Sequence, residues 1–310
     1  MKEILLLEPV FVEKIWGGSA LSSYGYRIPD KRIGEAYGIS ARTGCDCKIR
    51  NSIANGAKLS EFYQSKRDWF GNSEFTEFPF SFKLISANND SEVFVRTADN
   101  GFSSSNRVIK QGEFLYVLDS DEHASMIAGH KAVSREEASD SVRKGRLKLL
   151  TRDIPIRRGD FFRMDYGTVQ GFRPGTVVLS ICMEPCVTYR LSGNTRSEQN
   201  DFGREQQLAL DAVSFPSSAP KSDFIYSYRL DSAIVKRFAA SDGFLIEHMQ
   251  MNGTALVQSS GKFTAFSVLC GNGTINGNGL QTGDSFIIPS GYGNISLTGD
   301  LQLIRCTITK

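Results

Sequence analysis

Short runs of apolar residues, separated by Gly, Asn, Asp and Ser, recur along almost the whole chain. Short apolar runs bounded by such turn-forming residues are typical of β-strands, whereas an amphipathic helix needs a longer stretch with apolar residues every three to four positions. The pattern therefore predicts a mainly β protein. Its predicted strands form two sets, at 80–85, 93–95, 114–118, 154–156, 161–164 and 177–182, and at 225–228, 244–249, 255–257, 263–269, 285–289 and 301–309.

Helical patterns are few. The segment 134–150 begins with Ser134 and Glu137 at the spacing of a capping box and carries a charged face, which predicts a surface helix inserted between strands. Aromatic residues at helical spacing over 59–70, before Gly71, predict a second helix whose aromatic stripe faces the core. A third, short helix is expected over 204–213.

An internal repeat divides the chain into two β units. Gly159-Asp160 is followed by a strand and Gly167, and Gly283-Asp284 is followed without a gap by a second strand and Gly291. Between the copies, 214–223 is rich in Pro and Ser, as linkers often are. We expect a first unit over 1–213 with a helical insertion at about 131–150, a linker at 214–224 and a second unit over 225–310.

Two Gly-Asn-Gly clusters, at 271–273 and 277–279, superficially look like phosphate-binding loops. A phosphate loop joins a strand to a helix, and no helical pattern follows either cluster. We therefore expect hairpin turns at both.

Composition excludes several classes of function. The 310 residues are 40% hydrophobic and 23% charged, with a formal net charge of +2, which is the profile of an ordinary globular protein. There is no Lys/Arg run for nucleic acid and no apolar stretch long enough for a membrane span. The spacing of the six cysteines fits neither a dense disulfide scaffold nor a C-x-x-C pair, so we expect a reducing, cytoplasmic location.

The order of sequence motifs along the chain resembles that of a known protein family. It begins with Pro-Val-Phe-x-Glu-Lys-Ile-Trp-Gly-Gly over 9–18 and Gly-Glu-Ala-Tyr-Gly-Ile-Ser over 34–40, and it continues to the two glycine-turn repeats. Over essentially the whole chain, this order resembles the short bacterial form of the type I mannose-6-phosphate isomerases. The resemblance implies two cupin-like jelly rolls, with the helical insertion in the first. It also implies zinc-assisted interconversion of mannose 6-phosphate and fructose 6-phosphate.

The zinc ligands of that family are His, Glu and His, and the matching positions here are Arg96, Glu113 and Gln170. Arginine has no lone pair to offer a metal and carries its own positive charge. We therefore expect no bound zinc and no other cofactor. Without a cation, the Glu113 carboxylate would be buried and unpaired, which costs free energy. We predict that Arg96 forms an ion pair with Glu113 at the former zinc site and that Gln170 hydrogen-bonds nearby.

Other site residues follow from the same resemblance. The family's catalytic arginine matches Arg196, and Lys110 can partly replace a lysine that the family has two residues before its ligand Glu. We take Arg196, Glu113 and Lys110 as the catalytic candidates. Because a guanidinium suits a phosphate, the candidates for substrate binding are Arg190, Arg196 and Arg96.

Histidine and cysteine give weaker signals. None of His123, His130 and His248 stands at a family ligand position, so all three are expected to be structural. The spacing of Cys182 and Cys186 lets both side chains face one pocket, but it is weak evidence for a metal site.

Two functions remain open at this point. The first is a catalytically impaired, metal-free homologue that binds a sugar phosphate or a protein partner, with a regulatory role. In this case Phe94 and Arg96 could fill the pocket. The alternative is an active isomerase with weak or no metal dependence, because a carboxylate base and an electrophilic cation suffice for enediol chemistry. Isomerase activity in the presence of a chelator distinguishes the two.

Overall fold

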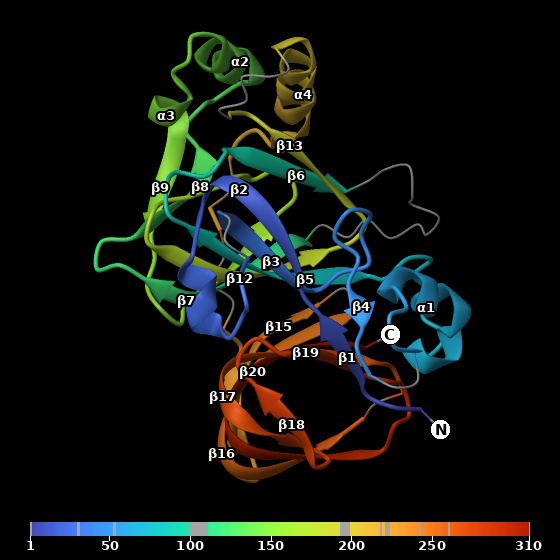
Figure 1. The fold of residues 1–310 in the computed structure, drawn as a ribbon. Helices are drawn as coiled ribbons and strands as arrows, with labels where there is room; N and C mark the ends of the chain where they lie inside the picture. Colours follow the sequence, from blue (N-terminus) through green and yellow to red (C-terminus); the bar gives the residue numbers. More distant parts are fainter. Residues whose placement is uncertain are drawn as a thin grey trace. The chain divides into compact units, whose positions relative to one another are not determined.

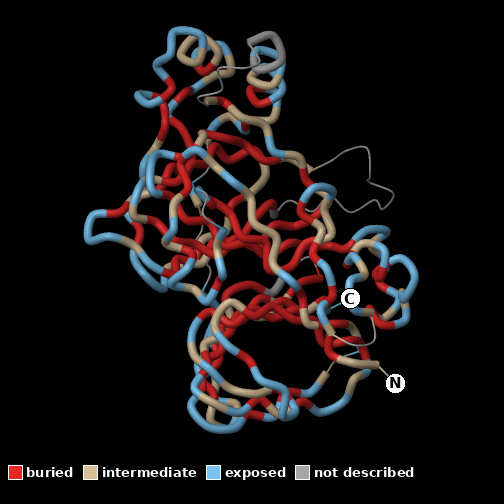
Figure 2. Tube along the Cα trace, viewed as in Figure 1, coloured by how far each residue is buried: buried red, intermediate tan, exposed pale blue. Residues whose placement is uncertain are grey.

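The computed structural model describes residues 2–29, 32–51, 54–98, 111–192, 199–217, 219–220, 224–241, 243–259 and 261–309. It confirms a mainly β protein (Figure 1). Figure 2 shows buried residues along the strands and exposed residues at the loops. Within the described ranges, no helix is both long and apolar enough to cross a membrane. The contacts group the chain into two compact units, which are described separately below.

The first unit comprises residues 1–13, 19–84 and 223–310 and contains a nine-stranded sheet in the order β14-β15-β16-β20-β17-β19-β1-β4, with β18 paired to β17. The long strands β16 and β20 pair along their whole length of 15 residues. Phe266 and Phe286 stack in its core with ring centroids 4.9 Å apart. The strands are β1 (Leu5–Glu8), β4 (Lys48–Ile49), β14 (Tyr226–Leu230), β15 (Ala233–Ser241), β16 (Phe244–Gln258), β17 (Thr264–Ile275), β18 (Asn278–Gln281), β19 (Ser285–Ile288) and β20 (Asn294–Ile308).

The same unit holds β3 (Ile33–Ile39) and the short helices η1 (Ala20–Tyr24), α1 (Leu59–Ser65) and η3 (Arg67–Phe70). The helix predicted over 59–70 is therefore divided into α1 and η3. The aromatic stripe faces the core as expected, because Phe62, Tyr63, Trp69 and Phe70 are all buried. Gly71 ends the segment in the left-handed conformation, at φ 71°.

The second unit comprises residues 14–18 and 85–222. Its five-stranded sheet has the order β13-β6-β11-β8-β9, and in a second sheet β7 lies between β10 and β12. Strands β2 (Val10–Gly18) and β5 (Phe80–Ala87) contribute residues to both units. The elements are β6 (Phe94–Ala98), β7 (Gln111–Ser120), β8 (Ser125–His130), β9 (Thr151–Pro155), β10 (Phe161–Asp165), β11 (Val169–Phe172), β12 (Thr176–Met183), β13 (Cys186–Arg190), α2 (Arg135–Arg143), α3 (Leu147–Leu150) and α4 (Gln199–Ala212).

The five-stranded sheet of this unit is covered on both faces. Phe94 and Phe172 belong to a core cluster that also contains residues of β7, β10 and β12. Val95 of β6 and Val169 of β11, both at odd-numbered positions, belong to a different cluster together with residues of α2, α3 and α4. Since successive side chains of a strand point to opposite faces, even-numbered positions of β6 and β11 face the other sheet and odd-numbered positions face the helices.

The repeat predicted from the sequence is a structural repeat. Gly159 and Gly283 have nearly equal left-handed φ angles, 91° and 90°. Asp160 accepts a hydrogen bond from the backbone N of Arg157 at 2.8 Å, and Asp284 accepts the corresponding bond from Gln281 at 2.9 Å. Glycine is needed here because an L side chain rarely adopts this conformation, and the aspartate closes the turn. Each turn leads into a strand, β10 in one copy and β19 in the other.

Two other expectations need correction. The helix predicted over 134–150 consists of α2 and α3, because Gly145 breaks the segment at φ 66°. The cluster 271–273 is not a hairpin turn but lies inside β17. A Cβ on Gly271 would lie 2.0 Å from the Asp300 carbonyl oxygen, so this glycine permits close approach of β20. Only the second cluster adjoins a turn, which Asn276 and Gly277 form with positive φ angles.

Candidate functional site

Arg96 and Gln170 lie on the inward face of the five-stranded sheet. Phe94 of β6 is directly opposite Gln170 of β11, and Arg96 follows two residues after Phe94. The two polar side chains are therefore diagonal neighbours on one face. The Arg96 guanidinium carbon lies 5.2 Å from the centre of the Phe94 ring, which is part of the core.

Glu113 comes from the other sheet. On β7 it lies opposite Met164 of β10 and Cys182 of β12. Ser180, two residues before Cys182, is its diagonal neighbour, and the Ser180 hydroxyl donates a short hydrogen bond to Oε1 of Glu113. The carboxylate is thus held from its own sheet by a serine.

A buried ion pair connects the two sheets. Nη1 of Arg96 lies 3.1 Å from Oε1 of Glu113, and the side chains are 3% and 0% exposed. The predicted pairing of these residues is confirmed. Removing one member of a buried ion pair costs about 3–5 kcal/mol, because it leaves the other charge buried without a counter-charge.

Gln170 is buried, and its predicted hydrogen bond stays a prediction. It is 2% exposed, yet its Oε1 atom accepts no hydrogen bond from any residue that the structure describes. Oε2 of Glu113 likewise accepts no hydrogen bond from the described residues. A buried acceptor without a donor costs about 1–3 kcal/mol, so a water molecule that donates to these oxygens would stabilise the protein.

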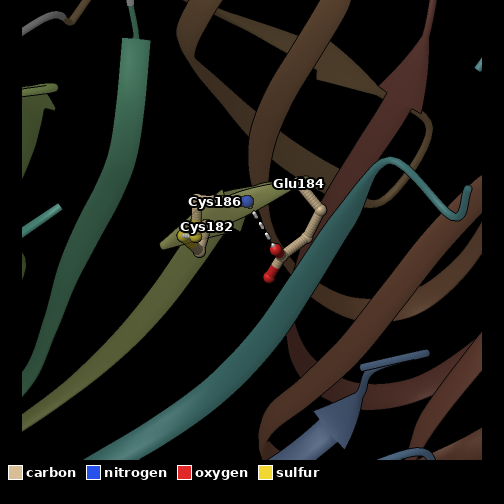
Figure 3. Close-up of side chains that lie close together, drawn as sticks. All are labelled: Cys182, Glu184 and Cys186. Atoms are coloured by element: carbon tan, nitrogen blue, oxygen red, sulfur yellow. Dashed lines mark hydrogen bonds between the residues drawn. The ribbon is translucent and has the colours of Figure 1, made fainter. Parts of the chain in front are cut away.

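A second polar cluster lies where β12 and β13 meet. Figure 3 shows the sulfur atoms of Cys182 and Cys186 next to each other, and the Sγ–Sγ distance is 3.2 Å. Glu184 lies between them in sequence and accepts a hydrogen bond of 3.2 Å from the backbone N of Cys186. All three residues are buried. The sequence spacing had left open whether both thiols face one site, and the structure shows that they do.

The electrostatics of this cluster are coupled. The hydrogen bond between the two thiols lowers the pKa of Cys182, and the positive charge of Arg96 acts in the same direction. The pKa of Cys186 is raised well above its usual value by the same hydrogen bond and by burial. Burial also raises the pKa of Tyr166, whose hydroxyl donates to the Met183 carbonyl at 3.2 Å. Tyr166 is therefore neutral at physiological pH.

Of the remaining predicted site residues, the structure describes Arg190. Arg190 pairs with Glu205 of α4 at 2.6 Å. Lys110 and Arg196 lie outside the described residues. Of the histidines, His130 contacts the Ser214 carbonyl oxygen through Nε2 at 3.0 Å, His248 is buried on β16, and His123 is exposed. None of the three is among the residues of the two clusters.

Sequence reasoning missed the buried ion pairs of the first unit, of which that of Lys83 is an example. Nζ of Lys83 lies 2.6 Å from Oε1 of Glu35 and 3.5 Å from the Tyr37 hydroxyl. The signal that could have identified it is the presence of charged residues inside otherwise apolar strands, Ile33–Ile39 and Phe80–Ala87. Charged residues are rarely buried unless they are paired, so two such interruptions predict an ion pair.

These units, with glycine-turn repeats and polar side chains inside a two-sheet core, define the chain as a cupin-type β protein. The model of the type I phosphomannose isomerase catalytic domain matches residues 4–113, and that of the mannose-6-phosphate isomerase cupin domain matches residues 234–308. The chain belongs to the mannose-6-phosphate isomerase family.

Relatives match over nearly the full length. The mannose-6-phosphate isomerase of Streptococcus mutans is 30% identical over 98% of both chains, and ManA of Bacillus subtilis is 29% identical over 97% of this chain and 98% of its own. The crystal structure of the mannose 6-phosphate isomerase from Bacillus subtilis has a TM-score of 0.87 at 28% identity and covers 99% of this chain and all of that one. The family and fold expected from the sequence are confirmed.

The buried ion pair predicts a non-additive double-mutant cycle. Arg96→Met should lower the free energy of unfolding by about 3–5 kcal/mol, because Glu113 is left buried without a counter-charge. Glu113→Gln added to Arg96→Met should restore at least about 1 kcal/mol of this loss, since it removes the unpaired charge. Urea unfolding of the wild type, the two single variants and the double variant measures the coupling. Additive effects would contradict a direct interaction.

Buried His248 predicts a loss of stability in acid. Burial lowers its pKa from 6.5 to about 4, so between these values the unfolded chain binds a proton that the folded chain does not. Stability should therefore fall as the pH falls from 6.5 to 4, by up to about 3 kcal/mol from this residue. In urea unfolding, His248→Gln should show a shallower acid dependence than wild type, whereas the exposed control His123→Gln should not. Equal profiles for all three would contradict the assignment.

Proposed function

We propose that this chain is a mannose-6-phosphate isomerase family protein whose zinc position is occupied by Arg96, so that it holds no metal there and is impaired as an isomerase. It retains the capacity to bind a sugar phosphate and acts as a regulatory homologue. The observation that carries the proposal is the buried contact of 3.1 Å between Arg96 and Glu113.

The side chains at the three ligand positions do not suit zinc. Zinc sites use thiolate, imidazole and carboxylate ligands, and Glu113 alone of the three offers one of these groups. The Arg96 guanidinium has no lone pair to offer a metal and contacts Oε1 of Glu113. A divalent cation beside it would also be repelled by the guanidinium charge. Among the described residues, Oε1 of Gln170 and Oε2 of Glu113 have no hydrogen-bond donor, so a water molecule could bind there without any metal ion.

The burial of the pair argues against catalysis by Glu113. Moving a proton between adjacent carbon atoms of a sugar requires a base within hydrogen-bonding reach of the substrate. The Glu113 side chain is 0% exposed, and Oε1 is engaged by Arg96 and Ser180. The same burial disfavours the alternative of metal-free isomerisation with Arg96 as the electrophile, because Arg96 is only 3% exposed.

A sugar phosphate remains the ligand that the family membership favours. A related enzyme from Salmonella typhimurium, which shares the fold at 13% identity and a TM-score of 0.74, has been solved bound to its substrate and zinc. In this chain Arg96 and Arg190 are engaged by Glu113 and Glu205. We therefore assign recognition of the phosphate to Arg196.

A coupled assay of mannose 6-phosphate conversion tests the impaired activity. Wild type should show no turnover above background with added zinc or with a chelator. Arg96→His combined with Gln170→His should raise kcat/KM at least about 100-fold in zinc, which corresponds to about 2.7 kcal/mol of transition-state stabilisation. Only the two-histidine variant offers the complete imidazole and carboxylate set.

The matched control is Arg96→Gln with Gln170→His, which removes the same guanidinium but supplies one imidazole fewer. It should stay inactive. Turnover by wild type in the presence of chelator would overturn the proposal and favour the alternative of a metal-independent isomerase. If the control and the two-histidine variant were equally active, removal of the Arg96 side chain, and not zinc ligation by two histidines, would be what restores turnover.

Titration calorimetry with fructose 6-phosphate tests the binding role. Arg196→Ala should weaken binding about 10-fold or more, because a charge-assisted hydrogen bond to the phosphate is lost. The exposed Arg146→Ala is the control and should bind as wild type does. Unchanged affinity of Arg196→Ala would contradict the assignment.

A further inference from the structure

We propose that Cys182, Glu184 and Cys186 form a binding site for a soft divalent cation of the zinc class, at the corner where β12 passes into β13. This site is distinct from the position of Arg96, Glu113 and Gln170. It does not depend on the proposed function, because its ligands come from a different set of side chains.

The two sulfur atoms are nearly at the separation that a shared metal ion requires. With zinc–sulfur bonds of about 2.3 Å at a tetrahedral centre, two thiolates lie about 3.8 Å apart. The observed Sγ–Sγ distance is 3.2 Å. An opening of about 0.6 Å, within the reach of small side-chain rotations, accommodates the ion.

Glu184 supplies the third ligand. One oxygen of its carboxylate and the two sulfur atoms all lie within 4.8 Å of one another. The hydrogen bond from the backbone N of Cys186 holds the carboxylate on this side of the corner (Figure 3). A carboxylate has lone pairs for more than one partner, so this bond orients the group without preventing ligation.

The chemistry of the ligands selects the ion. Thiolates favour zinc and similar soft cations over magnesium or calcium, which prefer all-oxygen sites. Binding displaces both thiol protons to solvent and places two thiolates and one carboxylate around a +2 ion. Three protein ligands leave a fourth position for a solvent or ligand oxygen, as in open zinc sites.

The site lies beside the buried ion pair. Cys182 is directly opposite Glu113 in the pairing of β12 with β7, and the charge of Arg96 acts on both thiols. Two thiolates and one carboxylate around a +2 ion leave a net charge of −1, which the neighbouring Arg96 guanidinium offsets.

Cobalt(II) titration of the reduced chain tests the site, since a thiolate–cobalt bond gives a strong charge-transfer absorption that zinc then abolishes. We expect one cobalt per wild-type chain, with all six thiols confirmed as reduced beforehand. Cys182→Ser and Cys186→Ser should each weaken binding by more than about 100-fold, beyond the loss typical of an outer-shell partner. Cys270→Ser, at an exposed cysteine, is the matched control and should bind normally.

Glu184→Gln provides a second variant with an intact thiol pair and should weaken cobalt about 10-fold while keeping the charge-transfer band. A wild-type chain with six free thiols and no charge-transfer band would overturn the proposal. So would an unchanged band in Cys182→Ser, which would place the ion at another thiol pair such as Cys45 and Cys47. The readout is independent of isomerase activity, so its failure leaves the proposed function untouched.

Discussion

The structure of the second unit depends on how the Glu113 carboxylate is compensated inside a two-sheet core. The residue is completely buried, and a carboxylate removed from water is stable only with a cation or strong hydrogen-bond donors beside it. Arg96 supplies the charge across the gap between the sheets, and Ser180 supplies a hydrogen bond from the same sheet. The Glu113 carboxylate can therefore be buried in this core without the full free-energy cost of an uncompensated charge.

The same compensation limits the chemistry that is available. A carboxylate held by a guanidinium and a hydroxyl has little freedom to act as a base, and a guanidinium so engaged is not free to polarise a sugar oxygen. The proposed impairment is thus compatible with membership of an isomerase family, because the contact with Arg96 compensates the buried Glu113 carboxylate without a metal ion. The thiol pair beside Arg96 then becomes the more suitable place for a soft cation in this part of the chain.

Sequence patterns predicted those features that local chemistry determines. The turns at Gly159 and Gly283 were predictable because only a few residues suit a left-handed turn closed by an aspartate. The pairing of Arg96 with Glu113 was predictable because the family resemblance places both residues at one zinc site, where a buried carboxylate needs a counter-charge. The cluster at 271–273 was wrongly predicted to be a turn. Its glycines allow β17 and β20 to approach each other closely, and this requirement comes from tertiary packing. The split of the 134–150 helix was missed because a capping signal marks where a helix begins but not how far it extends.

Features that depend on three-dimensional proximity were beyond the sequence. The carboxylate of Glu35 and the ammonium of Lys83 are 48 residues apart, and only the folded first unit brings them together. Gln170 shows a similar limit. The family resemblance places it near Arg96, but the partners that its amide group meets depend on packing that no spacing rule contains, and its Oε1 accepts no hydrogen bond from the described residues.

The most direct test of the account is anomalous X-ray diffraction at the zinc absorption edge, from crystals of the reduced chain equilibrated with zinc. The account predicts no anomalous peak within coordination distance of Glu113, with the guanidinium of Arg96 still in contact with that carboxylate. A zinc peak between Glu113 and Gln170, with Arg96 displaced, would contradict the claim that the arginine has taken the place of the metal.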